Sequence, residues 1–470
     1  MTVNLVRGIF TNRTLNLRSI KAIGYDMDYT LIHYRTRDLE AQAFEITRRR
    51  LLDAGWPVEG LAFDPDSVTR GLAIDLELGN LVKATRFGYI IRAAHGTRML
   101  SYDELRSAYA GELVDLADSR YGFMNTLYSV SEGNLFGQLV DLFDADRLPG
   151  VRSYGELAEV VGRALDRTHM DGTLKAEIYA DPARYMVPDP EVVQAVVDQR
   201  AAGKDLLLIT NSDWEYARRM MELAFDPYLP GDMTWRSLFQ TIIVSAGKPG
   251  FFAGDYHFLR VVDEERALLE PHRGPLAEGT VYYGGNAQLL ERSLGLSGDE
   301  ILYVGDHLFG DVHVSKSMFR WRTALILREL EAELLAMTAF RETEEKLTAL
   351  MAEKSDLERR RARLRLDLLR LEQHAATDVP EPDAGELLDL QSLIAALDDQ
   401  IAPLAQASGE LGNLLWGPIM RAGNDKSLFA RQVERYADVY TSRAANFLHE
   451  TPFAFLRAPR GSLPHDHYDR

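Results

Sequence analysis

The sequence predicts an α/β fold: a doubly wound parallel sheet with a large, mainly helical cap inserted after the first strand and a helical hairpin toward the C-terminal end. Four short apolar runs are each followed by polar residues and a helical pattern. Roughly 180 residues separate the first run from the second, and a leucine-rich, charged segment follows the last one. At 470 residues the chain exceeds what one hydrophobic core normally organises, so several structural units are expected.

The apolar runs are typical of buried strands. They span residues 21–26, 204–210, 239–245 and 299–306, and a last core strand follows within 323–330. Buried parallel strands are almost continuously hydrophobic, and functional side chains of such sheets gather at the carboxyl ends of the strands. The polar residues that end these runs are therefore the first candidates for a functional site.

The stretch between the first and second strands is too long for a crossover connection and predicts an inserted domain. We place the core at residues 1–40 and 190–330, and the cap at residues 41–189. Helical periodicity, as in residues 42–55, predicts a cap built mostly of helices. Within the core, residues 258–283 indicate a small β excursion before its final helix.

Leucines recur every seven residues from Leu350 to Leu371, and a break at 377–386 separates them from a second periodic segment at 387–406. This pattern predicts an antiparallel helical hairpin within a C-terminal region, residues 331–470, whose return segment packs on the core. We favour a leucine stripe that packs on its own return helix over a coiled coil with a partner.

The composition is that of a globular protein with an excess of acidic residues. Hydrophobic residues make up 46% of the chain, charged residues 26%, and the formal net charge is −18. That charge opposes binding to nucleic acid or to an anionic membrane. The absence of cysteine excludes disulfides, thiolate nucleophiles and Cys-ligated metals. No apolar stretch reaches the ~18 residues of a membrane span, and the first residues lack the apolar core of a signal peptide, so we expect a cytoplasmic protein.

Asp26 and Asp28 follow the first predicted strand as the pair D-x-D. Asp26 suits a nucleophile that forms an aspartyl phosphate, and Asp28 suits an acid that protonates the leaving oxygen and later activates water. A carboxylate that attacks phosphorus needs a metal ion and a cation to neutralise the phosphoryl oxygens. A D-x-D pair after a strand also serves as a turn or a helix N-cap, and by itself it does not decide between these interpretations.

Three later motifs supply the missing groups. Thr210-Asn211-Ser212 opens a predicted helix, where hydroxyl and backbone N–H groups hold phosphate oxygens, although simple N-capping would have the same pattern. Lys248, before a Pro-Gly turn, suits the fixed cation, although lysines in such turns are usually solvated. Asp306 and Asp311 after the fourth strand suit Mg²⁺, and N-capping explains one of them more easily than both.

The order D-x-D-x-T, T-N-S, Lys and G-D-x-x-x-x-D, each at a strand end, resembles the signature of the haloacid dehalogenase (HAD) superfamily of phosphatases. The chain also resembles the cytosolic purine 5′-nucleotidases nearly end to end. This closer resemblance is carried by NRTLNLRSIKAIGYDMDYTL, TRGLAIDLELGNLVK, MNTLYS, THMDGTLK, AGKPGFF, YVGDHLFGD and ARQVERYADVYTS. It implies hydrolysis of nucleoside 5′-monophosphates, IMP and GMP foremost, with Mg²⁺ as the cofactor.

The resemblance also implies which residues hold the metal and the substrate. Mg²⁺ is expected on the Asp26 carboxylate, the Asp28 backbone carbonyl and Asp306, with Asp311 in support. Besides Ser212, the residues expected to contact the nucleoside monophosphate are Tyr128, Asp166, His169 and Lys175. Two positions of this pocket depart from the family: its arginine falls on Gly162, and the aromatic residue after the histidine is Met170. Base preference is therefore left open.

A nucleotide effector site, for ATP or a related nucleotide, is a further implication of the resemblance. The matching positions are Asn125, Phe309, Gln432, Arg435 and Tyr436, while one basic position nearby is Ser317. The family also implies transfer of phosphate to nucleosides and a homo-oligomer, either a dimer or a tetramer. Two alternatives remain: a HAD phosphatase for another phosphomonoester, and a nucleotide-binding scaffold protein with little turnover.

Overall fold

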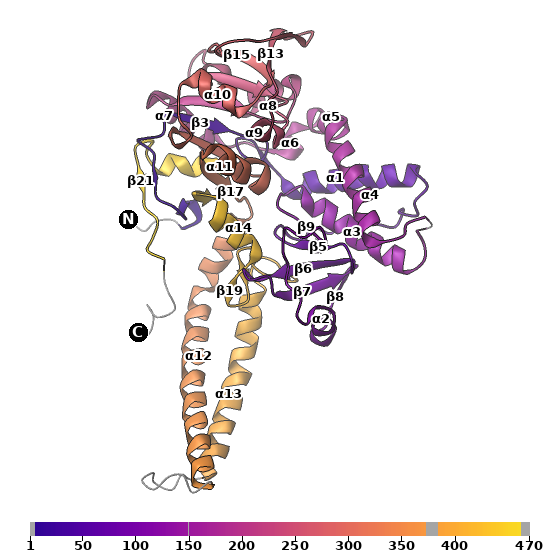
Figure 1. The fold of residues 1–470 in the computed structure, drawn as a ribbon, viewed down its shortest axis with the longest axis vertical. Coiled ribbons are helices and arrows are strands. Elements are labelled where there is room, and N and C mark those ends of the chain that lie inside the picture. The colour runs from indigo at the N-terminus through magenta and orange to yellow at the C-terminus, as the bar shows by residue number, and fades with distance from the viewer. Residues whose placement is uncertain (1–4, 149, 373–383, 462–470) are drawn as a thin grey trace. The chain divides into compact units, whose positions relative to one another are not determined.

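A ten-stranded sheet organises the larger of two compact units in this computed structural model, which describes residues 5–148, 150–372 and 384–461 (Figure 1). The larger unit comprises Met1–Glu331 and Ile419–Arg470, and the smaller unit comprises Ala332–Pro418. The strand order of the sheet is β1-β20-β17-β16-β3-β11-β12-β15-β13-β14.

Five parallel strands form the centre of this sheet, and all five were predicted. They are β3 (Ala22–Tyr25), β11 (Asp205–Ile209), β12 (Thr241–Val244), β16 (Ile301–Gly305) and β17 (Arg322–Ile326). β3 pairs in parallel with β11 on one side and with β16 on the other. The predicted α/β fold with a parallel sheet is confirmed, and the residue that follows β3 lies in the middle of the carboxyl edge.

The remaining strands extend the sheet at both ends. β15 (Thr280–Gly284) pairs in parallel with β12, and β13 (Phe258–Asp263) and β14 (Leu268–Pro271) follow as antiparallel strands within the predicted β excursion. At the other end, β20 (Val439–Thr441) pairs in parallel with β17, and β1 (Phe10–Thr11) pairs with β20. These two strands were not predicted, since runs this short carry no periodicity.

Helices cover both faces of the sheet. Side chains alternate along β3: the Tyr25 hydroxyl donates to Gln199 on α7 (Pro190–Ala201) at 2.7 Å, while Gly24 faces the opposite side. A Cβ on Gly24 would lie 2.9 Å from the ring of Tyr303, so glycine permits this packing. The apolar cluster on that side includes residues of three helices, α9 (Gly250–Ala253), α10 (Ala287–Leu294) and α11 (Val314–Phe319).

The inserted segment contains helices, as expected, and also a sheet that was not expected. Its helices are α1 (Thr36–Asp53), α2 (Tyr102–Tyr109), α3 (Ser129–Asp144), α4 (Tyr154–Met170), α5 (Thr173–Ala180) and α6 (Pro182–Tyr185). Its antiparallel sheet has the order β8-β7-β6-β5-β9, with β5 (Ala73–Asp75), β6 (Asn80–Ala84), β7 (Ile90–His95), β8 (Arg98–Met99) and β9 (Tyr121–Phe123). Because the insertion and the core share one compact unit, the domain boundaries at 40 and 189 stay predictions.

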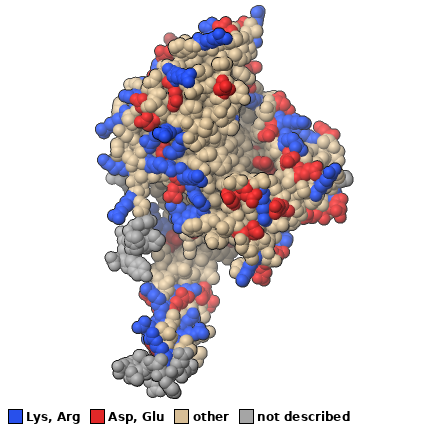
Figure 2. Space-filling view, viewed as in Figure 1, with Lys and Arg blue, Asp and Glu red and all other residues tan. Residues whose placement is uncertain are grey.

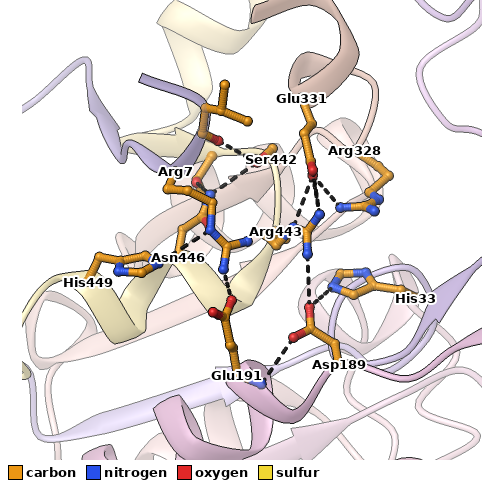
Figure 3. A network of polar contacts seen from close by, with 12 residues as sticks. Arg7, His33, Asp189, Glu191, Arg328, Glu331, Ser442, Arg443, Asn446 and His449 are labelled. Carbon is orange, nitrogen blue, oxygen red and sulfur yellow. Dashed lines mark hydrogen bonds and ion pairs between the residues drawn. The ribbon is translucent and has the colours of Figure 1, made fainter. Parts of the chain in front are cut away.

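Two short strands, β4 (His33–Tyr34) and β10 (Met186–Val187), pair where the chain enters and leaves the insertion. Beside them, His33 Nε2 lies 3.3 Å from Asp189 Oδ2 (Figure 3). Arg443 Nη1 lies 3.4 Å from the same oxygen, and its Nη2 donates to Glu331 at 2.6 Å. This polar network ties the entry of the insertion to the C-terminal return segment.

The smaller unit contains a helical hairpin formed by α12 (Leu330–Glu372), from Ala332 on, and by α13 (Ala384–Gly409). Leu350 and Leu357 pack against the cluster formed by Leu347, Leu397 and Ile401. The leucine stripe therefore packs on its own return helix, and that interpretation is confirmed for these positions. Most of the predicted break falls in 373–383, outside the described residues, as does the side chain of Leu371.

None of the helices in the described residues combines the length and the apolarity that crossing a membrane requires. On the face drawn in Figure 2, acidic side chains gather over the inserted segment, with Lys and Arg interspersed among them. With a net charge of −18, an anionic ligand is repelled at long range, so attraction must come from groups inside a site.

Candidate active site

Asp26 occupies the middle of the carboxyl edge of the sheet, directly after β3. Its backbone N–H donates to Val304 O at 2.9 Å, which extends the pairing with β16. Oδ1 accepts from the Met27 N–H at 2.8 Å and lies 2.8 Å from Lys248 Nζ. Oδ2 accepts no hydrogen bond from the described residues, so it is available to a metal ion or to phosphorus.

Lys248 brings a buried positive charge to two carboxylates. Its ammonium lies 2.8 Å from Asp26 and 2.9 Å from Asp311, and it donates to the Tyr303 hydroxyl at 2.9 Å. Asn211 fixes the loop that carries this lysine: Asn211 Nδ2 donates to Lys248 O at 3.0 Å, and Lys248 N donates to Asn211 Oδ1 at 2.7 Å. The lysine is thus held by the loops after β11 and β12, instead of being solvated.

Asp306 and Asp311 complete an acidic cluster with Asp26. One carboxylate oxygen from each of the three lies within 4.8 Å of the others. Asp306 Oδ2 is buried and has no hydrogen-bond partner among the described residues. Asp311 lies close to the strand because Gly305 has no side chain: a Cβ there would meet Asp311 Oδ2 at 2.5 Å. An orphaned oxygen within an all-oxygen donor set fits a hard divalent cation such as Mg²⁺.

Asp28 is held by two hydroxyl groups. Tyr34 donates to Asp28 Oδ1 at 2.5 Å and Ser212 donates to Oδ2 at 2.8 Å. The chain turns directly after Asp28, where Tyr29 has a φ of 57°. The oxygens of Tyr34 and Tyr216 lie 3.0 Å apart, which extends the hydroxyl chain toward the insertion. Asp28 is therefore oriented at a fixed position beside Asp26.

Thr210 and Ser212 shape the loop after β11. Thr210 Oγ1 accepts from the Ser212 N–H at 3.0 Å, and the Thr210 N–H donates to Ile243 O at 2.9 Å. The helix that follows, α8 (Trp214–Phe225), is N-capped by Asp213, not by Asn211 or Ser212. The capping alternative for those two residues is therefore wrong, and Ser212 is engaged with Asp28.

Burial controls the electrostatics of the cluster in the chain without a metal ion. It raises the pKa of Asp26 to about 7, against the opposing effect of Lys248. Burial also raises the pKa of Asp306 well above its usual value, and the carboxylates of Asp26 and Asp311 add to this effect. For Lys248, burial alone would lower the pKa, but these same two carboxylates raise it well above its usual value. The site therefore carries an excess of negative charge that a divalent cation would relieve.

Two of the cap residues implied for the substrate, Tyr128 and His169, lie together. Their ring centroids are 4.7 Å apart, and Tyr128 also lies 5.0 Å from Tyr29. His169 Nε2 is buried without a hydrogen-bond partner in the part of the chain that the structure describes, and burial lowers the pKa of His169 to about 4. The rings of Tyr29, Tyr128 and His169 are thus neighbours in a row that starts next to Asp28, and the imidazole at its end is neutral at pH 7.

The other cap positions differ in their surroundings. Lys175 lies 2.6 Å from Asp213 Oδ2 and 4.8 Å above the Tyr216 ring, near the hydroxyl chain that reaches Asp28. Asp166 is exposed on α4, and Met170 is 84% exposed. At Gly162, a Cβ would meet only Glu132 Oε1, at an ordinary 3.7 Å, so a side chain would fit there.

Four of the five implied effector positions lie on α14 (Leu428–Tyr436) and the π-helix at Leu308–His313, and the fifth, Asn125, follows β9. The rings of Phe309 and Tyr436 lie 6.1 Å apart, and the Arg435 guanidinium lies 5.2 Å from the Tyr436 ring. Gln432 is buried, and Asn125 Oδ1 is buried without a hydrogen-bond partner among the described residues. Ser317 is exposed on α11.

Three residues that contact Asp28, Lys248 or the acidic cluster were missed by sequence reasoning: Tyr34, Tyr303 and Arg70. Tyr303 lies inside an apolar strand, where a tyrosine is indistinguishable from a packing residue. Tyr34 ends the apolar run after the D-x-D pair, and that position was the only signal available. Arg70 falls within the stretch TRGLAID but lies far along the chain from every motif.

Comparison with known proteins places the whole chain among nucleotidases. The model of a family described as the 5′ nucleotidase family matches residues 9–468. A 5′-nucleotidase domain-containing protein of Dictyostelium discoideum is 26% identical over 469 residues, covering 97% of this chain and 74% of that protein.

Solved structures resemble the chain only remotely. An archaeal β-phosphoglucomutase from Pyrococcus sp. strain ST 04 shares 10% identity at a TM-score of 0.31, covering 65% of this chain and 86% of that one. A HAD phosphatase from Thermococcus onnurineus shares 17% identity at a TM-score of 0.25, covering 66% and 87%. Scores this low do not bear on the substrate.

Proposed function

The chain belongs to the 5′ nucleotidase family and is a HAD-type phosphomonoester hydrolase, and on this premise we propose that it hydrolyses nucleoside 5′-monophosphates through an aspartyl phosphate on Asp26. One observation carries the proposal: the carboxylates of Asp26, Asp306 and Asp311 converge with the Lys248 ammonium at one edge of the sheet. That arrangement combines a nucleophile with the charges that a phosphoryl group requires.

We propose Mg²⁺ as the cofactor, held by the Asp26 carboxylate, the Asp28 backbone carbonyl and Asp306, with Asp311 in support. The buried, unpartnered Oδ2 of Asp306 and the clustering of three carboxylates favour this assignment. When bound, the ion offsets the negative charge of the phosphoryl oxygens and of the site itself. Attack on phosphorus and the proton transfers are carried out by side chains of the protein.

In the first step, an Asp26 carboxylate oxygen attacks phosphorus, the P–O bond to the nucleoside breaks, and Asp28 gives its proton to the departing 5′-oxygen. In the second step, water attacks the aspartyl phosphate, gives a proton to Asp28, and releases inorganic phosphate and Asp26. The hydroxyls of Tyr34 and Ser212 can donate or accept, so they can stay bonded to Asp28 in both of its protonation states.

Lys248 and Thr210, with the Ser212 backbone, are proposed to hold the phosphoryl oxygens. Tyr128 is proposed to stack on the base, His169 to border it, and Lys175 to contact the phosphate or ribose. A purine, as in IMP or GMP, fits this arrangement best because its two fused rings offer the larger stacking face. The place of Asp166 in this pocket stays a prediction, since its side chain is exposed.

The same aspartyl phosphate allows phosphotransfer whenever a nucleoside hydroxyl reaches Asp26 before water does. We also propose that ATP or a related nucleotide acts at Asn125, Phe309, Gln432, Arg435 and Tyr436. The support is that Phe309 lies on the π-helix that also carries Asp311, so a ligand on Phe309 would act next to the site. The homo-oligomer and the cytoplasmic location stay predictions.

The test is phosphate release from a panel of nucleoside monophosphates and sugar phosphates, with Mg²⁺, by the natural chain and by Asp26→Asn. We expect purine monophosphates to be turned over fastest, and Asp26→Asn to lose release while keeping its fold by circular dichroism. Turnover in Asp26→Asn would reject the mechanism. A sugar phosphate as the best substrate would favour another phosphatase, and binding without turnover in the natural chain would favour a scaffold protein.

A second arm tests the effector. The same panel is run with and without ATP on the natural chain and on Tyr436→Ala, a position on α14 outside the acidic cluster. Activation by ATP that disappears in Tyr436→Ala supports the effector site, and equal activation of both proteins contradicts it.

A further inference from the structure

Arg70 is a buried cation that connects the inserted sheet to the acidic cluster. It precedes β5, and its side chain is 0% exposed. Its Nε donates to Asn125 O at 3.0 Å and its Nη2 donates to the backbone oxygen of Asp306. Its Nη1 lies 3.6 Å from Glu329 Oε2. One guanidinium thus reaches the loop after β9 and the loops after β16 and β17.

The chain around Arg70 is constrained to keep the guanidinium there. Gly71 has a φ of +87°, and a Cβ at Gly71 would lie 2.8 Å from Phe429 Cβ, so only glycine permits this approach. The Gly71 N–H donates to Met124 O at 2.7 Å, which joins the loops before β5 and after β9. The guanidinium lies 5.3 Å from the Phe429 ring centroid, a cation–π contact.

The hydrogen bond from Arg70 to Asp306 differs from an ordinary structural contact because it holds the main chain of a residue of the acidic cluster. Arg70 binds the main chain of the residue whose side-chain Oδ2 is buried and unpartnered within the described residues. Holding that peptide sets the direction of the carboxylate. Glu329 supplies only a 3.6 Å ion pair, and Arg70 Nη1 makes no hydrogen bond to the described residues. The two backbone carbonyls therefore account for all of its hydrogen bonds there.

We propose that Arg70 is a positioning residue for the metal site: it orients Asp306 for the ion and ties the inserted sheet to that orientation. The inference rests on the metal site proposed above. Because Arg70 bonds both Asp306 and Asn125, metal binding and the order of the inserted loops are linked, and by reciprocity each strengthens the other. Residues that orient metal ligands typically change metal affinity by about 10- to 100-fold when replaced.

The first measurement is Mn²⁺ binding by paramagnetic resonance, without substrate, on the natural chain and on Arg70→Lys. Lysine keeps the charge, but its single ammonium group cannot reach two carbonyls and a carboxylate at once, as the planar guanidinium does. We expect Arg70→Lys to bind Mn²⁺ about 10-fold more weakly or worse. The second measurement is hydrogen exchange at the Gly71 amide, which Mn²⁺ should slow in the natural chain and slow less in Arg70→Lys.

Arg120→Lys is the matched control. Arg120 lies just before β9 of the inserted sheet and is 14% exposed, and it binds Asp75 through Nε at 3.0 Å and Nη2 at 2.8 Å, away from the acidic cluster. Its replacement should leave Mn²⁺ affinity unchanged. Equal weakening in both variants, or unchanged affinity in Arg70→Lys, would overturn the proposal.

Asp306→Asn distinguishes a failure of the proposed metal site from a failure of the proposed role of Arg70. If Asp306→Asn abolishes Mn²⁺ binding while Arg70→Lys does not weaken it, the metal site stands and the role of Arg70 fails. If Asp306→Asn binds Mn²⁺ normally, the metal site itself is wrong. Should Arg70→Lys not fold, Glu329→Gln is measured instead, because it removes the ion pair that holds Arg70 Nη1. Weaker Mn²⁺ binding in Glu329→Gln then supports the proposal, and unchanged binding rejects it.

Discussion

The ammonium of Lys248 lies 2.8 Å from Oδ1 of Asp26, although the two residues follow strands that are separated by β11 in the sheet. The same ammonium contacts Asp311 at 2.9 Å. Lys248 therefore offsets the charge of two carboxylates and keeps one oxygen of Asp26 in a fixed direction. A nucleophile must be oriented and still ionised, and this contact serves both requirements.

Replacing Lys248 by Met should reduce kcat for nucleoside monophosphates by about 10²- to 10³-fold, the usual loss when one charge-stabilising donor is removed. The physical reason is that Asp26 and Asp311 then face each other without the ammonium. The measurement is steady-state phosphate release at saturating Mg²⁺. Lys21→Met, at an exposed lysine just before β3, should retain full activity. A Lys248→Met enzyme with normal kcat would show that this contact is only structural.

Gly305→Ala should displace Asp311, because the new methyl group would meet Asp311 Oδ2 at 2.5 Å within a strand that cannot move. We expect weaker Mn²⁺ binding and a loss of stability of about 1–3 kcal/mol, as for other overpacked sites. Calorimetric metal titration and urea unfolding measure the two effects. Gly60→Ala, where no atom lies within 4 Å of the new methyl group, should change neither quantity. Normal Mn²⁺ affinity in Gly305→Ala would mean that Asp311 does not take part in the metal site.

Arg443→Met should destabilise the larger unit by about 1–3 kcal/mol, since Asp189 and Glu331 each lose one partner and keep His33 and Arg328, respectively. The network around Arg443 also includes His33 (Figure 3). The next residue, Tyr34, binds Asp28. Urea unfolding gives the free energy.

For comparison, Arg457→Met, at an exposed arginine of the same return segment, should stay within about 0.5 kcal/mol. Equal unfolding free energies for Arg443→Met and the natural chain would show that the desolvation cost of the ion pairs cancels their electrostatic attraction.

His169 predicts a pH dependence of stability. Burial lowers its pKa from 6.5 to about 4, so below pH 6.5 the unfolded chain binds a proton that the folded chain does not. Its contribution is therefore fully present above pH 6.5 and is lost as the pH falls toward 4. From these two pKa values, about 2 kcal/mol is lost by pH 5.

His169→Gln removes this titration while keeping a side chain of similar size. The free energy of unfolding of the natural chain minus that of His169→Gln should fall by about 2 kcal/mol between pH 7 and pH 5. A difference that stays constant over this range would mean that the pKa of His169 is the same in the folded chain as in the unfolded chain.

Local pattern was sufficient for the central strands and for the hairpin. The runs around Asp26, Thr210 and Asp306 are continuous and apolar, and a buried parallel strand needs little else. In the sheet of the insertion, β6 and β7 have five and six residues and were overlooked between the longer helical patterns, whereas β5 and β9 are three residues each, too short for any periodicity to register. β20 was missed for the same reason, and it forms only because the return segment pairs with β17.

The sequence by itself determined which residue types end each central strand, and hence the chemistry at the edge of the sheet, because apolar runs and D-x-D are patterns of near neighbours. Only the tertiary structure decided which groups meet there: Tyr34 on Asp28, Lys248 between Asp26 and Asp311, and Arg70 on the main chain of Asp306. Such contacts join loops from different strands, so they follow from strand order and register, which periodicity along the chain does not encode.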